Sequence, residues 1–139
     1  MFNKILAAID GSPASEKVLA AAVDLATHYQ AELIALSVAE LPEVVAMVDE
    51  VDELKQSADD YFRKIGEASV EYARSRGVKL QNVVLRGHAA NEIVRFIEAE
   101  GVNLLVLGRH GHSRVTRFFL GSTSDRVSEH CHCTVMIVK

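Results

Sequence analysis

A glycine-rich stretch in the C-terminal third of the chain has residue types that can hold phosphate. It reads Gly108-Arg109-His110-Gly111, then nine residues, then Gly121-Ser122-Thr123. It follows an apolar run at residues 102–107 and leads into a short helix expected at residues 122–130. Glycines let backbone N–H groups approach a ligand, and the N-terminus of a helix attracts negative charge. The pattern predicts a cradle for a polyphosphate.

The charge around this stretch differs from that of the rest of the chain. Between Gly101 and Ser124 there is no acidic residue, whereas the whole chain has a net charge of −4. The same segment contains three arginines: Arg109, Arg114 and Arg117. These side chains could screen phosphate charge, or they could be solvated loop residues, and the sequence leaves both interpretations open.

Asp10 is the second candidate for chemistry. It follows the apolar run at residues 5–9 and precedes Gly11. In an open α/β sheet, ligands bind beyond the carboxyl ends of the strands, where the strand order reverses. If the first and fourth strands are neighbours, Asp10 faces the same crevice as Gly108. A carboxylate there could accept hydrogen bonds from sugar hydroxyls or hold a metal on phosphate. An isolated Asp-Gly would indicate only a turn, but the nearby glycine loop favours a ligand.

The elements that must position these residues alternate along the chain. Strands are expected at residues 5–9, 33–38, 81–86, 102–107 and 134–138. Helices are expected from Pro13 after a Ser12 cap, through 54–72 up to Gly77, through 90–97 up to Gly101, and over 122–130. Strands separated by helices predict right-handed crossovers and an α/β fold with a parallel sheet. The polar run 81–86 belongs near an edge, and the apolar run 102–107 belongs in the interior. We expect a single domain over residues 1–139.

The composition limits the classes of function. A pI near 5.8 argues against nucleic-acid binding, and no apolar run approaches the ~20 residues that span a bilayer. The N-terminus shows no signal-peptide layout, so the expected location is the cytoplasm, without membrane insertion. The spacing of Cys131 and Cys133 makes them poor disulfide partners, which agrees with a reducing compartment.

An acidic segment separates the second strand from the long helix. Residues 40–60 contain eight acids and one lysine, and residues 40–53 are expected to form a solvated connection. The tyrosines of the helices fall at apolar helical spacing, so core packing is expected for Tyr29, Tyr61 and Tyr72.

These motifs resemble a known family. Gly-x-x-Gly, nine residues and Gly-Ser is similar to the nucleotide-binding signature of the ATP-binding branch of the universal stress proteins. Ile-Leu-Ala-Ala-Ile-Asp-Gly-Ser at residues 5–12 resembles their first strand, and residues 128–138 resemble their last helix and strand. The resemblance covers essentially the whole chain. It departs from the family pattern around the junction of Cys133 and Thr134, where many relatives have a proline and this chain has His132 and Thr134 instead. It implies a doubly wound, five-stranded parallel sheet of order 3-2-1-4-5 with helices on both faces. This fold is Rossmann-like, of the adenine nucleotide alpha hydrolase-like kind.

The resemblance also implies a ligand, ATP, with or without Mg²⁺. Asp10 would meet the ribose, and the backbone near Val38 would meet adenine. Gly108 and Gly111 would wrap the ribose and the α-phosphate. The β- and γ-phosphates would be held by Gly121, Ser122 and Thr123. Arg109 joins the candidate site through its place in the glycine loop, without a contact assigned to it.

The implied function is that of a nucleotide-loaded stress regulator or sensor in the cytoplasm. It would act on an unknown partner protein, such as a transporter, and form a homodimer through residues 134–138, with higher assemblies open. A slow ATPase or phosphotransferase is one alternative, and a nucleotide-free dimerising module is another. No metal site is expected at His130-Cys131-His132-Cys133, because four consecutive residues cannot readily converge on one tetrahedral ion.

Overall fold

Five parallel strands form one sheet in the order β3-β2-β1-β4-β5. The computed structural model describes residues 1–40, 48–109 and 121–139. The strands are β1 (Lys4–Ala8), β2 (Glu32–Ala39), β3 (Leu80–Arg86), β4 (Leu104–Gly108) and β5 (Thr134–Val138). The predicted strand order is confirmed. The point at which the strand order reverses lies between the parallel neighbours β1 and β4.

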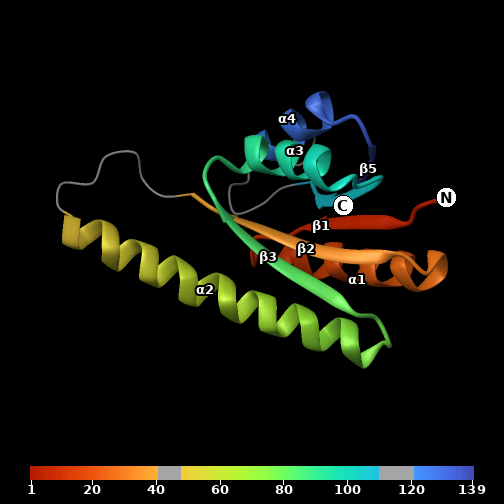
Figure 1. Cartoon of the computed structure of the whole chain (residues 1–139), viewed down its shortest axis with the longest axis horizontal. Coiled ribbons are helices and arrows are strands. Elements are labelled where there is room, and N and C mark those ends of the chain that lie inside the picture. Colours follow the sequence, from red (N-terminus) through yellow and green to blue (C-terminus); the bar gives the residue numbers. More distant parts are fainter. Residues whose placement is uncertain (41–47, 110–120) are drawn as a thin grey trace.

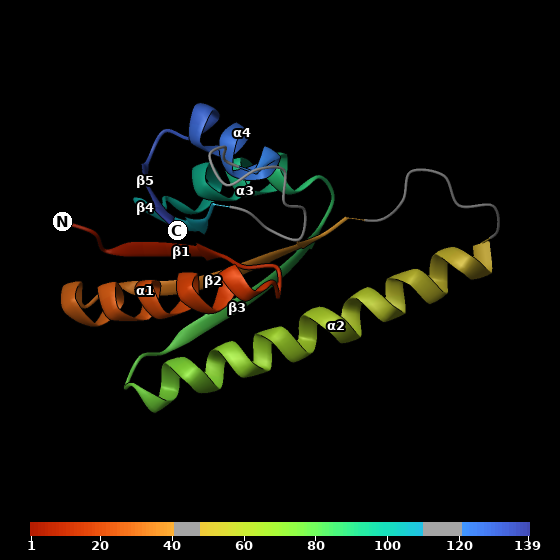
Figure 2. The same cartoon turned by 180° about the vertical axis from the view of Figure 1, so that it is seen from behind.

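Helices cover both faces of the sheet (Figures 1 and 2). They are α1 (Pro13–Tyr29), α2 (Val48–Ser75), α3 (Ala89–Glu100) and α4 (Ser122–His130). Ile5 and Ala7 pack in the core cluster that includes residues of α1 and α2, whereas Leu6 packs in the cluster that includes residues of α3 and α4. This alternation follows from the two-residue period of a strand, and it makes the doubly wound arrangement that was predicted.

The position of each strand in the sheet follows its hydrophobicity. All of β1, β2 and β4 lie between two neighbours, and most of their residues are buried. The edge strands β3 and β5 alternate between exposed and half-buried positions along most of their length. The predictions of an edge position for residues 81–86 and an interior position for 102–107 are therefore confirmed.

The acidic segment was predicted wrongly in part. Residues 40–53 were expected to form a solvated connection, but α2 already begins at Val48. Acidic residues are common in the first turns of a helix, because the helix dipole favours negative charge there. Residues 41–47 lie outside the described part of the chain.

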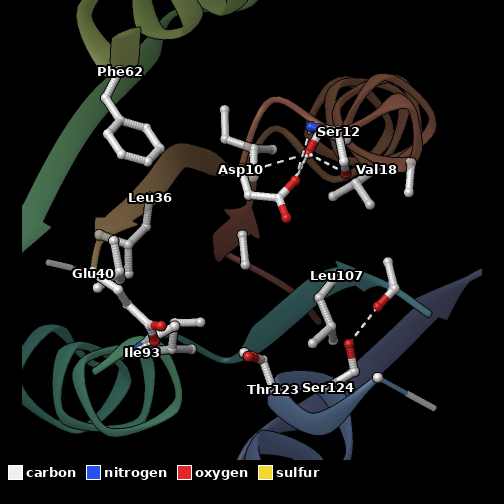
Figure 3. Close-up of a pocket in the computed structure, with 18 of the residues that line it drawn as sticks. Asp10, Ser12, Val18, Leu36, Glu40, Phe62, Ile93, Leu107, Thr123 and Ser124 are labelled. Carbon is white, nitrogen blue, oxygen red and sulfur yellow. Dashed lines mark hydrogen bonds between the residues drawn. The ribbon is translucent and has the colours of Figure 1, made fainter. Parts of the chain in front are cut away.

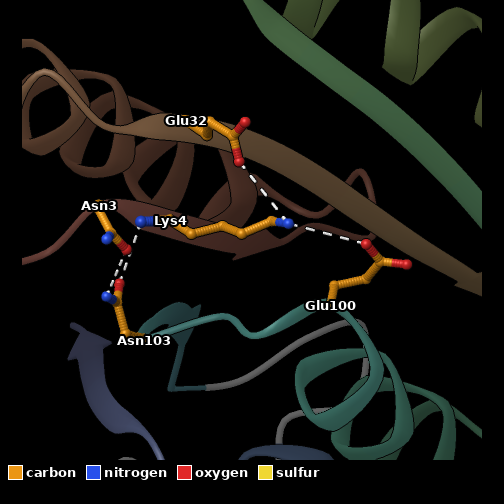
Figure 4. A network of polar contacts seen from close by, with 5 residues as sticks. All are labelled: Asn3, Lys4, Glu32, Glu100 and Asn103. Carbon is orange, nitrogen blue, oxygen red and sulfur yellow. Dashed lines mark hydrogen bonds and ion pairs between the residues drawn. The ribbon is translucent and has the colours of Figure 1, made fainter.

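A polar network ties the amino ends of three strands to one another and to the carboxyl end of α3 (Figure 4). The Lys4 ammonium lies 3.7 Å from a Glu32 carboxylate oxygen and 3.8 Å from one of Glu100. Asn103 accepts the backbone N–H of Lys4 through Oδ1 and donates through Nδ2 to Asn3 Oδ1. These contacts lie at the amino ends of β1, β2 and β4, which leaves the carboxyl ends of the strands for the site.

Candidate functional site

A pocket of about 750 Å³ lies beyond the carboxyl ends of the central strands (Figure 3). Its walls come from the turn after β1, the end of β2, one face of α2, the start of α3, the end of β4 and the start of α4. The strands β1 and β4 are adjacent, and the helices that follow them, α1 and α4, pack on opposite faces of the sheet. The pocket therefore occupies the topological switch point, where open α/β sheets bind their ligands.

Asp10 is fixed in this pocket by the first turn of α1. Its Oδ1 accepts the backbone N–H of Ser12 at 2.9 Å and the hydroxyl of Ser15 at 2.9 Å. The Ser15 hydroxyl in turn accepts the backbone N–H of Asp10 at 2.9 Å. Ser12 and Pro13 begin the helix as predicted, although the Ser12 side chain makes no capping hydrogen bond. Asp10 thus serves the turn and also lines the pocket, so the two interpretations of this residue are compatible.

The start of α4 is joined to the end of β4. The Ser124 hydroxyl donates to the Gly108 carbonyl at 2.5 Å, and the Gly121 N–H donates to the Arg109 carbonyl at 2.6 Å. Gly121 caps the helix with an extended backbone of φ −62° and ψ 158°. The N–H groups of a helix's first turn have no intrahelical acceptor. This end of the pocket therefore presents donors and the positive end of a helix dipole.

The part of the pocket between the end of β2 and the start of α3 is mainly apolar and also contains one carboxylate. Leu36 and Ile93 are buried lining residues there, and Val38 lies half-buried near the end of β2, whereas Leu107 lies beside Thr123 and Ser124 (Figure 3). Glu40 follows β2, and its Oε1 accepts the backbone N–H of Ala89 at 2.6 Å. This bond links the end of β2 to the start of α3 and completes the wall. The pocket therefore combines an apolar end with a polar end.

One face of α2 forms a wall that the sequence did not predict. Tyr61 was expected in the core, but its side chain is 43% exposed and its hydroxyl donates to the Asp10 carbonyl at 2.9 Å. Burial, and then the charge of Asp10, raise the pKa of Tyr61. Phe62 lines the pocket next to it and points toward Leu36 and Asp10 in Figure 3. The start of α2 extends past the sheet (Figure 1). Helical spacing shows which residues share a face of this helix, but it does not show whether that face meets the core or a pocket.

Six of the eight predicted site residues line the same pocket. They are Asp10, Val38, Gly108, Gly121, Ser122 and Thr123. Arg109 is half-buried and bonds through its backbone to Val138 and Gly121, but it is not among the described lining residues. Gly111 lies outside the described residues, as do His110, Arg114 and Arg117.

Several residues line the pocket although the sequence analysis did not predict them for the site; they include Ser15, Glu40, Tyr61 and Phe62. Of these, only Ser15 had a local signal, since a serine in the first turn of a helix that follows Asp-Gly-Ser can reach back to the aspartate.

Two kinds of feature are absent from the described residues. Within residues 1–40, 48–109 and 121–139, no three His, Cys, Asp or Glu side chains are grouped so that they could hold a metal ion. Over the same part of the chain, no helix is long and apolar enough to cross a membrane.

The strand order and the pocket at the switch point define an open α/β protein of the Rossmann-like class. The model of the universal stress protein family matches residues 1–139, and the chain belongs to that family. A relative in Bacillus subtilis (strain 168), Universal stress protein YxiE, is 38% identical, and the match covers 100% of both chains.

Solved structures share the fold. That of hypothetical protein MJ0577 has a TM-score of 0.90 at 27% identity and covers 100% of this chain and 96% of its own; MJ0577 is a universal stress protein of Methanocaldococcus jannaschii. A universal stress protein from Archaeoglobus fulgidus in complex with dAMP has a TM-score of 0.71 at 20% identity, covering 100% and 98%. A family protein from Arabidopsis thaliana with AMP bound has a TM-score of 0.69 at 17% identity, covering 99% and 91%.

Proposed function

We propose that this chain, as a single domain, binds ATP in the pocket and acts as a nucleotide-loaded regulator. One observation carries the proposal. A fixed carboxylate, Asp10, and the start of α4 line the same pocket. A nucleoside polyphosphate needs an acceptor for its sugar hydroxyls and donors for its phosphates, and these two features supply them.

The two ends of the pocket suggest how the nucleotide lies. The phosphates would point toward Gly121, Ser122 and Thr123, where helix N–H groups and two hydroxyls are available. The base would lie at the apolar end, near the backbone of Val38. The volume of about 750 Å³ is within the usual range of ~300–1,000 Å³ for small-molecule sites. Gly108, Gly111 and Arg109 complete the proposed cradle, and Mg²⁺ would bind with the phosphates.

Universal stress proteins with bound dAMP and AMP support an adenine nucleotide as the ligand. ATP is the form we propose, because the start of α4 offers several backbone N–H groups and the hydroxyls of Ser122 and Thr123 to a chain of phosphates.

Nucleotide binding would act by stabilising one form of the protein. A ligand that binds only the folded form raises the free energy of unfolding by RT ln(1 + [L]/Kd). We propose that the loaded protein acts in the cytoplasm on a partner protein and forms a homodimer through β5. An edge strand offers unpaired backbone groups to a second copy, and Met136 on β5 is 37% exposed.

ATP hydrolysis is the competing function. Hydrolysis needs a positioned water molecule and usually a base. Among the described lining residues, the carboxylates are Asp10 and Glu40, and one oxygen of each already accepts backbone N–H groups. No observation on the described residues favours turnover.

Titration calorimetry with ATP and Mg²⁺ tests the proposal. We expect saturable binding of one ATP per chain, weaker binding of GTP, and phosphate release no faster than in buffer. Gly121→Val is the matched variant. Its backbone conformation suits valine, so we expect the fold to persist while the side chain occupies phosphate space and weakens binding at least about tenfold. Unchanged affinity in a folded Gly121→Val variant would contradict the placement of the phosphates. Rapid phosphate release would favour the enzyme.

A further inference from the structure

The two cysteines of the chain lie in contact between α4 and β5. Both are free and half-buried, and their Sγ atoms are 3.2 Å apart. The spacing in the sequence suggested that they would be poor disulfide partners, whereas the structure brings the two sulfur atoms together. They pack beside the core cluster between the sheet and the helices α3 and α4.

The backbone explains why the thiols meet. Cys131 caps α4 in an extended conformation, with φ −81° and ψ 136°, and its N–H donates to the Val127 carbonyl at 2.8 Å. In extended backbone, residues two apart project to the same side. Thr134 then starts β5 in register with Leu104. The short segment is thus held at both ends, and each thiol also donates to a nearby carbonyl, that of Cys133 or Thr134.

We propose that Cys131 and Cys133 form a reversible thiol–disulfide pair that is closed by a small-molecule disulfide such as oxidised glutathione. A disulfide bond is about 2.05 Å long, so the sulfur atoms must approach by about 1.2 Å from 3.2 Å. The ring that closes is small and its backbone is held at both ends. Strained disulfides are the more easily reduced and the more labile ones. The pair is therefore suited to opening and closing rather than to permanent cross-linking.

The reaction proceeds in two exchanges. The Cys131 thiolate attacks one sulfur of oxidised glutathione, forms a mixed disulfide and releases one glutathione thiolate. Cys133 then loses its proton, attacks the Cys131 sulfur and expels the second glutathione as a thiolate. Two protein thiols are oxidised, one glutathione disulfide is reduced to two thiols, and the protons pass through water.

Closure of the pair does not depend on which thiol attacks first, but the environment of Cys133 favours attack by Cys131. Burial raises the pKa of Cys133 to about 12, and the hydrogen bond and charge of Cys131 add to this. The thiolate is the nucleophile, so Cys133 is a poor first attacker and suits the second, intramolecular step. There the attacked sulfur is already in contact.

The experiment uses the full chain and glutathione. The reduced protein is incubated in mixtures of reduced and oxidised glutathione, quenched with acid, alkylated and weighed by mass spectrometry. We expect a species that lacks two hydrogens, resists alkylation, and returns to the dithiol when reduced glutathione is in excess. Its fraction should not depend on protein concentration, because the bond forms within one chain. This outcome does not depend on nucleotide binding.

Single-cysteine variants supply the matched controls. Cys133→Ser should stop at a lasting glutathione adduct on Cys131, and this adduct should form at least about tenfold faster than the one on Cys133 in Cys131→Ser. The proposal is overturned if the unaltered protein also stops at a glutathione adduct, if it stays a dithiol in oxidised glutathione, or if the disulfide joins two chains on a non-reducing gel. Equal adduct rates in the two variants would overturn the order of attack.

Discussion

The two roles of Asp10 can be separated by a pair of substitutions. Asp10→Ala removes the oxygen that accepts the Ser12 N–H and the Ser15 hydroxyl. Asp10→Asn keeps an oxygen at the same position but removes the charge. We expect Asp10→Ala to impair both stability and nucleotide binding, and Asp10→Asn to impair mainly binding.

The magnitudes follow from burial. Ser12 is only 3% exposed, so in Asp10→Ala its N–H loses a partner where water has little access. An unsatisfied buried donor costs about 1–3 kcal/mol. With the weaker loss at Ser15, we expect a total near 2–3 kcal/mol, or a fall in Tm of roughly 6–12 °C. Asp10→Asn loses only the charge near the start of α1, which is about 0.5–1 kcal/mol.

Urea unfolding and ATP calorimetry measure the two effects in the same preparations. A ribose hydroxyl bound to an amide oxygen instead of a carboxylate loses about 1–1.5 kcal/mol, or roughly tenfold in Kd. Equal losses of stability in the two variants would refute the assignment of Oδ1 to the turn. Unchanged ATP affinity in a folded Asp10→Ala variant would refute its assignment to the sugar.

Three further predictions concern two residues of α2 and one residue of the edge strand β5. Gly66→Ala should cost about 1–3 kcal/mol in urea unfolding, because its new Cβ would lie 2.0 Å from Nδ2 of Asn82; Asn82→Ala in the same chain should recover part of this loss. Tyr61→Phe should remove a loss of stability at alkaline pH. The pKa of Tyr61 is raised in the folded state, so the stability that its hydroxyl adds is present below about pH 10 and is lost as the pH rises through the folded pKa. The same change in the free energy of unfolding between about pH 8 and about pH 11 in both proteins would count against it. Met136→Lys should shift the sedimentation coefficient toward that of a monomer, because it places a charge on β5, and an unchanged dimer would locate the interface elsewhere.

Much of the fold could be predicted from local patterns. Apolar runs gave the strands, and the polar run 81–86 identified an edge because an edge strand is less covered than an interior strand. Gly101 ends α3 with φ +68°, a conformation that favours glycine. The start of α2 was missed because acidic residues suit both a loop and the first turns of a helix.

The candidate site was predictable only where its residues belong to local motifs. Asp10 and the glycines around α4 could be identified because strand ends and helix starts leave sequence signals. Tyr61 and Glu40 reach the pocket through the packing of α2 and the contact between β2 and α3, which depend on residues far apart in the chain. The contact of the two thiols likewise required the extended backbone at Cys131.

Mass spectrometry of small molecules released from the purified protein tests the central claim most directly. We expect an adenine nucleotide, chiefly ATP, at close to one per chain, and we expect folded Gly121→Val protein to be recovered without it. A folded, unaltered protein that carries no nucleotide and shows no heat on titration with ATP and Mg²⁺ would contradict the proposed cradle.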